Sequence, residues 1–154
     1  MLLRRNQYTP DYYKSKIVSD YTPEERTCYN AYLSYEKRKN EIDERYKHTY
    51  IYQLSIYDKD KDEDLLYIGH TINLHKRLKQ HKCYSTKNTT SKEIGNIRLY
   101  EIIQRLGGWE NVKVSILENV SCKNLLNAVE REQHWYNIKN PLLNSNPPSV
   151  SSIK

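Results

Sequence analysis

A basic stretch in the middle of the chain places a guanidinium and an imidazole at helical spacing. Arg77 and His81 are four residues apart in the run Asn73 to His81, and residues at that spacing share one face of a helix. A guanidinium fork pairs well with phosphate oxygens, and an imidazole can hold or pass on a proton. The stretch therefore predicts a site that binds a phosphate and supports a proton transfer.

A short buried strand must lead the chain into this helix. The apolar run Leu65 to Ile68 predicts that strand, with Gly69 as its end, and Asn73 is placed to cap the helix that follows. The helix is strongly basic. A polar loop over residues 82–90 is expected to follow it. The candidate nucleic-acid contacts are Lys76 and Lys79 on the helix and Lys82 at the start of the loop.

A second strand, residues 49–57, precedes the first, and the acidic segment 58–64 joins them as a hairpin loop. We interpret this loop as a solvated turn, since it lacks the central glycine and distal glutamate of a calcium loop. In an antiparallel hairpin, Tyr52 and Tyr67 then lie on one sheet face, directly opposed or one diagonal step apart. The hairpin therefore predicts a pair of neighbouring phenols.

The remainder of the chain predicts two more helices and a strand between them. A helix should run from a Ser91 cap to about Leu106, and another from Lys123 to about Asn137 after a Ser121 cap. Between them, Val112, Val114 and Ile116 alternate with polar residues, which is typical of a half-buried strand. On the last helix Glu132 points toward the buried face, where a carboxylate needs a partner or a metal ion.

The N-terminal part predicts an extension that precedes these elements. Residues 1–20 lack periodicity, and Thr22 with Pro23 starts a helix that should reach about Lys47. The stripe on this helix, formed by Tyr32, Tyr35, Ile42 and Tyr46, favours packing on the domain, or pairing with a second copy as a homodimer, over contact with nucleic acid. The predicted division is therefore an extension over 1–48, a catalytic domain over 49–145 and a short tail over 146–154.

Charge and composition narrow the class of protein. Of the net charge of +6, residues 65–105 alone contribute 8 Lys/Arg against 2 Asp/Glu, which suits a polyanion such as nucleic acid, although a solvated lysine-rich face is the simpler alternative. Three cysteines without paired spacing favour a reducing compartment. With no apolar run of about 20 residues and no signal peptide at the first residues, we expect no membrane segment and an intracellular location, in the cytoplasm, nucleoid or nucleus.

Five elements in order resemble the signature of the GIY-YIG endonuclease superfamily over about residues 49–145. They are Tyr50-Ile51-Tyr52, Tyr67-Ile68-Gly69, Arg77 with His81, Glu132, and Asn144. The resemblance implies an α+β fold with a small three-stranded antiparallel sheet flanked by helices. Two positions depart from the family pattern: Tyr50 stands at the first glycine, and His70 follows the second one. The segment 130–136 resembles the helix of phage intron homing endonucleases, which places the metal ligand at Glu132 rather than Glu130.

The family likeness implies hydrolysis of DNA phosphodiesters with one divalent ion, Mg²⁺ or Mn²⁺. Glu132 would bind the metal, Arg77 the phosphate, and Tyr52 would accept the water's proton. Tyr67 and His81 would position water or relay protons, with Gly69 and Asn144 in support. A phenol has a pKa of about 10, so the role of Tyr52 requires Arg77 or the metal to lower it.

Other interpretations remain open at this point. The tyrosines could be sheet residues with satisfied hydroxyls, and Glu132 could form an ion pair with Arg77. The domain could also be a nucleic-acid-binding module without activity, and a nuclease could serve mobile or viral DNA, restriction or structure-selective repair. A zinc site is the least favoured alternative because its ligands lack paired spacing. Its candidates are His70, His75, His81 and Cys83.

Overall fold

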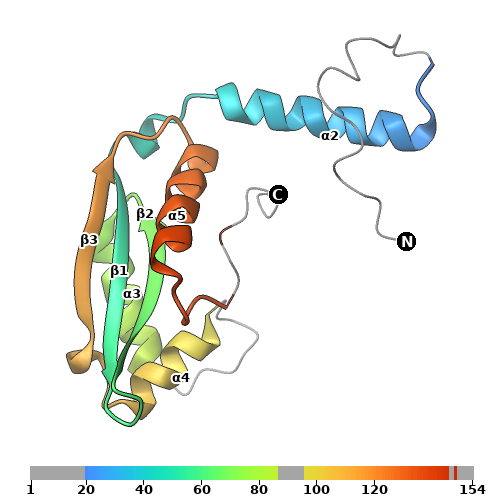
Figure 1. Ribbon diagram of the computed structural model, residues 1–154. Coiled ribbons are helices and arrows are strands. Elements are labelled where there is room, and N and C mark those ends of the chain that lie inside the picture. The colour runs from blue at the N-terminus through green and yellow to red at the C-terminus, as the bar shows by residue number, and fades with distance from the viewer. Residues whose placement is uncertain (1–19, 87–95, 146–147, 149–154) are drawn as a thin grey trace. The chain divides into compact units, whose positions relative to one another are not determined.

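A computed structural model describes residues 20–86, 96–145 and 148 and divides the chain into two compact units, Met1–Glu41 and Ile42–Lys154 (Figure 1). Each unit is described by itself. The predicted arm over residues 1–20, apart from Asp20, and the tail beyond Ser145, apart from Pro148, lie outside the described residues. No helix within the described ranges is long and apolar enough to cross a membrane.

The first unit contains helix α2, Pro23–Asn40. Its predicted start is confirmed, because Thr22 and Glu25 form a reciprocal capping box and Pro23 occupies the first turn. The predicted end at Lys47 is wrong. The backbone becomes extended at Glu41, and a separate 3₁₀ turn, η2 (Glu44–Lys47), follows in the second unit.

Within the second unit, backbone hydrogen bonds attach the segment around η2 to residues 122 and 123. Asp43 N donates to the carbonyl of Lys123 at 2.7 Å, and Cys122 N donates to the carbonyl of Tyr46 at 3.0 Å. Ile42 and Tyr46 therefore do not continue the stripe of α2, and Ile42 is 70% exposed.

Three antiparallel strands form the sheet of the second unit: β1 (Thr49–Asp58), β2 (Glu63–Thr71) and β3 (Lys113–Val120), in the order β2-β1-β3. The predicted hairpin is confirmed. Its loop is solvated except at Asp58, which is fully buried and forms an ion pair with Arg105 at 3.1 Å. Gly69 does not end β2 as predicted, since the strand continues to Thr71.

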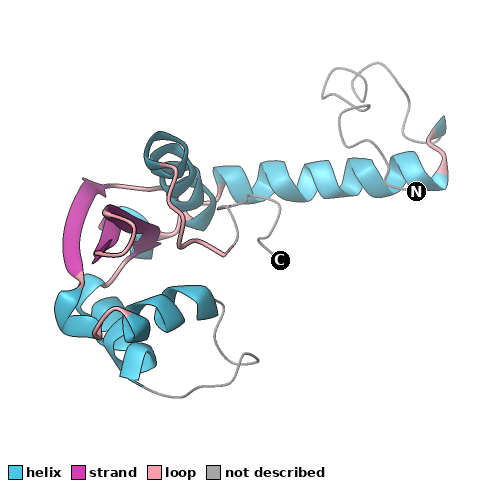
Figure 2. Ribbon diagram, turned by 60° about the horizontal axis from the view of Figure 1, so that its bottom comes forward, coloured by secondary structure: helices cyan, strands magenta, loops and turns pink. Residues whose placement is uncertain are grey.

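Helices cover the two faces of the sheet (Figure 2). Helix α5 (Leu125–Lys139) lies on one face, and α3 (Leu74–Thr86) with α4 (Ile97–Arg105) lies on the other. The core on the α3 and α4 side is built from alternate strand residues, including Tyr52 and Tyr67, and from Leu99, Tyr100 and Ile103 of α4. This layering confirms the α+β prediction.

The observed ends of the helices differ from several of the predicted ends. Asn73 caps α3 as predicted, accepting from Lys76 N at 2.9 Å, but α3 continues to Thr86 where a loop from Lys82 was expected. Asn124, not Ser121, caps α5, because its side chain accepts from Asn127 N at 3.0 Å. The Ser91 cap lies outside the described residues.

The third strand is less buried than its alternation predicts. Val114 is 39% exposed and Ile116 54%. The strand lies at the edge of the sheet, and its pairing with β1 has a register irregularity opposite Ile51 and Tyr52. The prediction of a half-buried strand was therefore wrong for these two side chains.

Candidate active site

Two phenols come together on the α3 side of the hairpin. Tyr52 pairs with Gly69 and Tyr67 pairs with Leu54, so the two tyrosines are one diagonal step apart, with ring centroids separated by 6.3 Å. This confirms the placement predicted from the hairpin. Tyr52 is 0% exposed and Tyr67 4%.

Gly69 is required by the position of the Tyr52 ring. A Cβ at residue 69 would lie 2.7 Å from the Tyr52 hydroxyl oxygen and 2.9 Å from its Cζ. The glycine therefore allows the tyrosine to lie across strand β2, which is the physical reason for this residue.

Arg77 and His81 share the predicted face of α3 and both reach Tyr52. The Arg77 Nε donates to the Tyr52 hydroxyl at 3.2 Å, and His81 Nε2 lies 2.8 Å from the same oxygen. His81 is fully buried, stacked on Trp109 with an interplanar angle of 9°. The structure therefore links the guanidinium, the phenol and the imidazole in one hydrogen-bonded chain.

Burial sets the protonation states of this chain. Burial raises the pKa of Tyr52, and the neighbouring Tyr67 raises this pKa further. The charge of Arg77 lowers the pKa of Tyr52, but by less than burial raises it. Burial, together with the Arg77 charge, lowers the pKa of His81 to about 3. In this structure Tyr52 is therefore a neutral phenol and His81 a neutral imidazole near pH 7.

The sequence interpretation did not single out two residues that complete the hydrogen bonding. The Tyr100 hydroxyl lies 2.9 Å from His81 Nδ1, and Asn96 Nδ2 donates to the Tyr67 hydroxyl at 3.3 Å. Tyr100 is 5% exposed, and burial raises its pKa. A tyrosine on the apolar face of a predicted helix was the available signal, because a buried phenol needs a partner.

The position of Glu132 follows from the hydrogen bonds that hold α5 against β3. On the same helix, Arg131 and Trp135 both donate to Glu118 of β3, at 2.8 and 2.9 Å. Glu132 then contacts His70 Nδ1 through its Oε2, with side chains 13% and 20% exposed respectively. The partner of Glu132 is therefore His70, and no ion pair with Arg77 is present among the described residues.

The charge of Glu132 reaches the tyrosine pair, since it contributes to the raised pKa of both Tyr52 and Tyr67. Glu130, the other acid of this helix considered as a metal ligand, is exposed and accepts from Asn127 instead. Glu132 and Glu130 thus differ in burial and in their hydrogen-bond partners.

The donors at Glu132 fit a hard divalent cation. Mg²⁺ is held by one or two carboxylate oxygens and keeps several waters, and Glu132 supplies one such carboxylate, with His70 in contact with it as a supporting residue. Within the described ranges, no cluster of three or more His, Cys, Asp and Glu side chains is positioned to hold a metal.

The four zinc candidates are not gathered. His81 is bonded to Tyr52 and Tyr100, His70 to Glu132, and both His75 and Cys83 are exposed. The geometry therefore does not support the zinc alternative.

Asn144 fastens the outer edge of β2 beside the site. Its Oδ1 accepts from Ile68 N at 3.0 Å, and its Nδ2 donates to the Ile68 carbonyl at 2.8 Å. The preceding residue, Leu143, donates from its N to the Leu66 carbonyl at 2.9 Å. The side-chain amide of Asn144 thus pairs with the edge strand as a neighbouring strand would.

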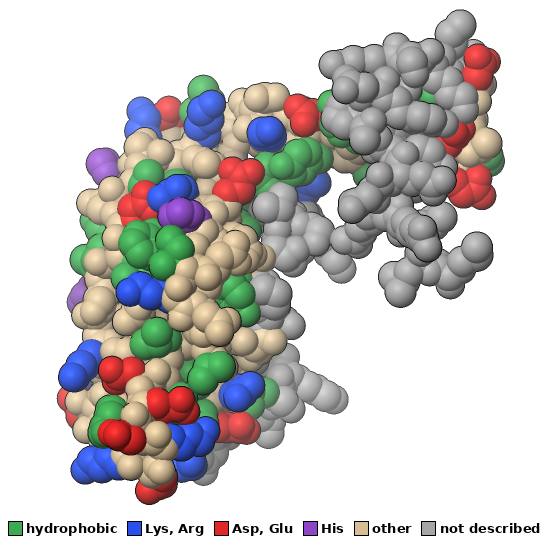
Figure 3. Space-filling model, in the orientation of Figure 1, with side chains coloured by type: hydrophobic (Ala, Val, Ile, Leu, Met, Phe, Trp, Pro, Cys, Tyr) green, Lys and Arg blue, Asp and Glu red, His purple; other side chains and the backbone are tan. Residues whose placement is uncertain are grey.

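The lysines of α3 differ in their surroundings. Lys76 and Lys79 are exposed, while Lys82 is exposed but forms an ion pair with Glu110 at 2.8 Å. Figure 3 shows the face with α5, where basic and acidic side chains are mixed, particularly over the hairpin end of the sheet. This mixture gives that face no uniform attraction for a polyanion.

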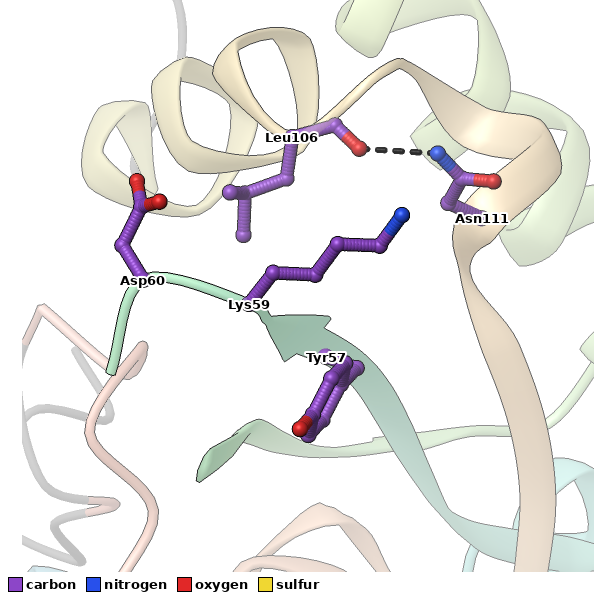
Figure 4. Close-up of a pocket in the computed structure, with 5 residues that line it drawn as sticks. All are labelled: Tyr57, Lys59, Asp60, Leu106 and Asn111. Atoms are coloured by element: carbon purple, nitrogen blue, oxygen red, sulfur yellow. Dashed lines mark hydrogen bonds between the residues drawn. The ribbon is translucent and has the colours of Figure 1, made fainter. Parts of the chain in front are cut away.

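A separate hollow lies at the hairpin end of the sheet (Figure 4). It is lined by Tyr57, Lys59, Asp60, Leu106 and Asn111, and Asn111 Nδ2 donates to the Leu106 carbonyl at 2.8 Å. It contains none of the candidate catalytic residues.

The fold and the site define a small α+β domain with a tyrosine pair, a guanidinium, an imidazole and a carboxylate around one end of an antiparallel hairpin. A family model described as the GIY-YIG catalytic domain matches residues 48–145. The chain belongs to this family, which is one of nucleases. Searches of curated proteins and of solved structures gave no significant match.

Proposed function

We propose that this protein is a metal-dependent DNA endonuclease, for which Mg²⁺ or Mn²⁺ is the cofactor. The observation that carries the proposal is Arg77, a half-buried guanidinium that pairs with no carboxylate among the described residues and is held through its Nε by Tyr52. A fixed cation without an acidic partner is suited to a phosphate. Exposed lysines beside it on α3 extend the positive charge toward a longer polyanion.

Glu132 would hold the cation, and His70 beside it would fix the carboxylate. A bound divalent ion neutralises charge on phosphoryl oxygens and lowers the pKa of water. Arg77 would bind the scissile phosphate during the same step. Arg77 and the cation that Glu132 would hold would provide the two positive contacts that phosphodiester hydrolysis requires.

For Tyr52 we propose a role in orienting Arg77. Acting as the base toward water would require a phenolate, which burial disfavours and a bound cation would favour, whereas the observed hydrogen bond fixes the guanidinium with the neutral phenol. His81 then serves as the neutral partner of the Tyr52 hydroxyl.

The biological substrate is proposed from the resemblance alone. The segment 130–136 favours a nuclease of mobile-element or viral DNA, and a restriction-type or structure-selective repair nuclease is the second choice. A panel of plasmid, linear, branched and single-stranded DNA distinguishes these substrate classes.

The test compares cleavage by wild type, Arg77→Ala and Glu132→Gln with Mg²⁺, with Mn²⁺ and with chelator. Glu130→Gln is the matched control, since this exposed acid lies on the same helix. We expect metal-dependent cutting that both site variants lose and the control retains. Salt-sensitive DNA binding without cutting by wild type would contradict the proposal and indicate an inactive binding module.

A further inference from the structure

A chain of four side chains runs from the buried core to the half-exposed guanidinium of Arg77. Tyr100 contacts His81 at 2.9 Å, His81 contacts Tyr52 at 2.8 Å, and Tyr52 contacts Arg77 at 3.2 Å. Tyr52 and His81 are 0% exposed and Tyr100 5%, so water does not replace these partners. The direction of each hydrogen bond in the chain is therefore set within the protein.

Arg77 determines that direction. A guanidinium has only donors, so the Tyr52 oxygen must accept from Arg77 Nε. The single hydroxyl hydrogen of Tyr52 then needs an acceptor. The acceptor 2.8 Å away is His81 Nε2. The oxygen of the neighbouring Tyr67, which also interacts with Tyr52, already accepts from Asn96 Nδ2 and from Arg77.

Acceptance at Nε2 fixes the tautomer of His81. A neutral imidazole carries one hydrogen, so an unprotonated Nε2 places it on Nδ1. The Nδ1 atom faces the Tyr100 hydroxyl, whose oxygen can accept this hydrogen. The opposite tautomer would leave the buried Tyr52 hydrogen without its acceptor, which is costly in a site closed to water.

We propose that Tyr100 is a positioning residue that holds His81 in the Nδ1–H tautomer, so that Tyr52 presents an acceptor to Arg77. The tautomer is a property of the folded protein itself. Its effect on phosphate binding during cleavage rests on the function proposed above. In that reaction Tyr100, His81 and Tyr52 orient the Arg77 guanidinium from the side of the core and do not themselves touch the substrate.

The matched variants are Tyr100→Phe and Tyr84→Phe. Tyr84 packs edge-on against Tyr100 with ring centroids 5.6 Å apart, but its hydroxyl does not contact His81 in the described hydrogen bonds. Both variants lose one hydroxyl from the same aromatic cluster. The comparison therefore separates the hydrogen bond to His81 from the packing of the rings.

The experiment measures ¹⁵N chemical shifts of both His81 ring nitrogens in the complete protein at pH 7.5. We expect a protonated Nδ1 and an unprotonated Nε2 in wild type and in Tyr84→Phe, and a mixture of tautomers in Tyr100→Phe. A protonated Nε2 in wild type, or an unchanged tautomer in Tyr100→Phe, would overturn the proposal.

Cleavage kinetics provide the second measurement. We expect kcat of Tyr100→Phe to fall about three- to tenfold, as for one lost hydrogen bond, with little change in KM. Tyr84→Phe should leave both kcat and KM unchanged. An unchanged kcat would overturn the link to catalysis. If wild type cleaves no DNA, the proposed function fails, and the nitrogen shifts still decide the tautomer.

Discussion

Burial of the tyrosine and histidine side chains decides which hydrogen bonds the site can form. Tyr52 and His81 are both fully enclosed, and each keeps its neutral form because a charge there would be separated from water. Arg77, which is only half-buried, is the member of the chain that retains its charge. The site therefore combines a neutral interior with a cation at its edge.

This arrangement predicts a pH dependence of stability. The pKa of His81 is about 3 in the folded protein and about 6.5 in the unfolded chain. Between these values the unfolded chain binds the extra proton, so the free energy of unfolding falls as the pH is lowered below about 6.5. One proton corresponds to at most about 1.4 kcal/mol per pH unit, or about 2 kcal/mol by pH 5.

Urea denaturation between pH 7 and pH 5 measures this effect. His81→Gln should be less stable than wild type at pH 7 because its hydrogen bonds are lost, but its stability should decline less on acidification. Parallel pH profiles for the two proteins would show that His81 is not the group responsible.

His70 provides a second prediction about a single side chain. Its contact with Glu132 fixes the carboxylate that we propose as the metal ligand, and loss of such a supporting partner costs roughly 10- to 100-fold in metal affinity. His70→Ala should weaken Mn²⁺ binding to the DNA-free protein by that factor, measured by electron paramagnetic resonance. His75→Ala, at an exposed histidine of α3, should bind as wild type does. Equal affinities in the two variants would argue against the supporting role.

At the scale of elements, β2 is an edge strand whose outer side is closed by a side chain. Asn144 makes two hydrogen bonds with Ile68, in the middle of the strand that carries Tyr67 and Gly69. An unpaired edge would leave these backbone groups without protein partners. Asn144 therefore supports the strand on which two site residues lie.

We expect Asn144→Ala to lower the free energy of unfolding by about 2 kcal/mol, corresponding to two hydrogen bonds of about 1 kcal/mol each. Chemical denaturation of wild type and variant measures the difference. Asn119→Ala, at an exposed position of β3, is the control and should change stability by less than about 0.5 kcal/mol. An equally large decrease in the free energy of unfolding of Asn119→Ala would contradict a specific role for Asn144.

The exposed lysines of α3 predict the salt dependence of DNA binding. Each phosphate contact contributes about −0.9 to the slope of log K against log salt. A double variant with Lys76→Ala and Lys79→Ala should therefore reduce the steepness of this slope by about 2 in fluorescence anisotropy titrations. Lys82→Ala should have a smaller effect, because Lys82 is paired with Glu110.

The control for this prediction carries Lys123→Ala and Lys139→Ala, two exposed lysines outside α3. It loses the same charge and should retain the wild-type slope. Equal slopes for the two double variants would mean that net charge, rather than α3, determines binding.

Elements with strong local signals were predictable from the sequence. The β-strand composition and the acidic turn determined the hairpin, and the capping signals of Thr22 and Asn73 located two helix starts. The spacing of Arg77 and His81 also placed them correctly on one helix face. These features depend on residues close together in the chain.

Features that depend on distant partners were not predictable. Glu132 and His70 are 62 residues apart in the sequence, and Tyr100 and His81 are 19 apart, so no periodicity links them. Helix α2 ends at Asn40, and residues 43 and 46 then form backbone hydrogen bonds with residues 122 and 123. The position of this helix end depends on these distant partners in the same way. Residue 69 must be glycine because the ring of Tyr52, on the neighbouring strand, occupies the space of a Cβ.

For the whole molecule, the positive charge belongs to the nuclease domain rather than to α2. Helix α2 contains three Glu against four Lys and Arg, so it adds little attraction for a polyanion. It has one buried residue, Glu25, and its Leu33 is 45% exposed. An 18-residue helix with so small a buried face gains little stability by itself, which favours a role in association.

We therefore expect the full chain to form a homodimer through α2, seen as a concentration-dependent sedimentation coefficient. A shortened protein beginning at Ile42 should be monomeric and still folded, since it keeps the backbone bonds of Asp43 and Tyr46 to the second unit. A protein beginning at Thr49 lacks these bonds and should unfold at lower urea concentration. A strictly monomeric full chain would contradict the dimer, and weaker DNA binding by the Ile42 protein would then assign α2 to substrate contact instead.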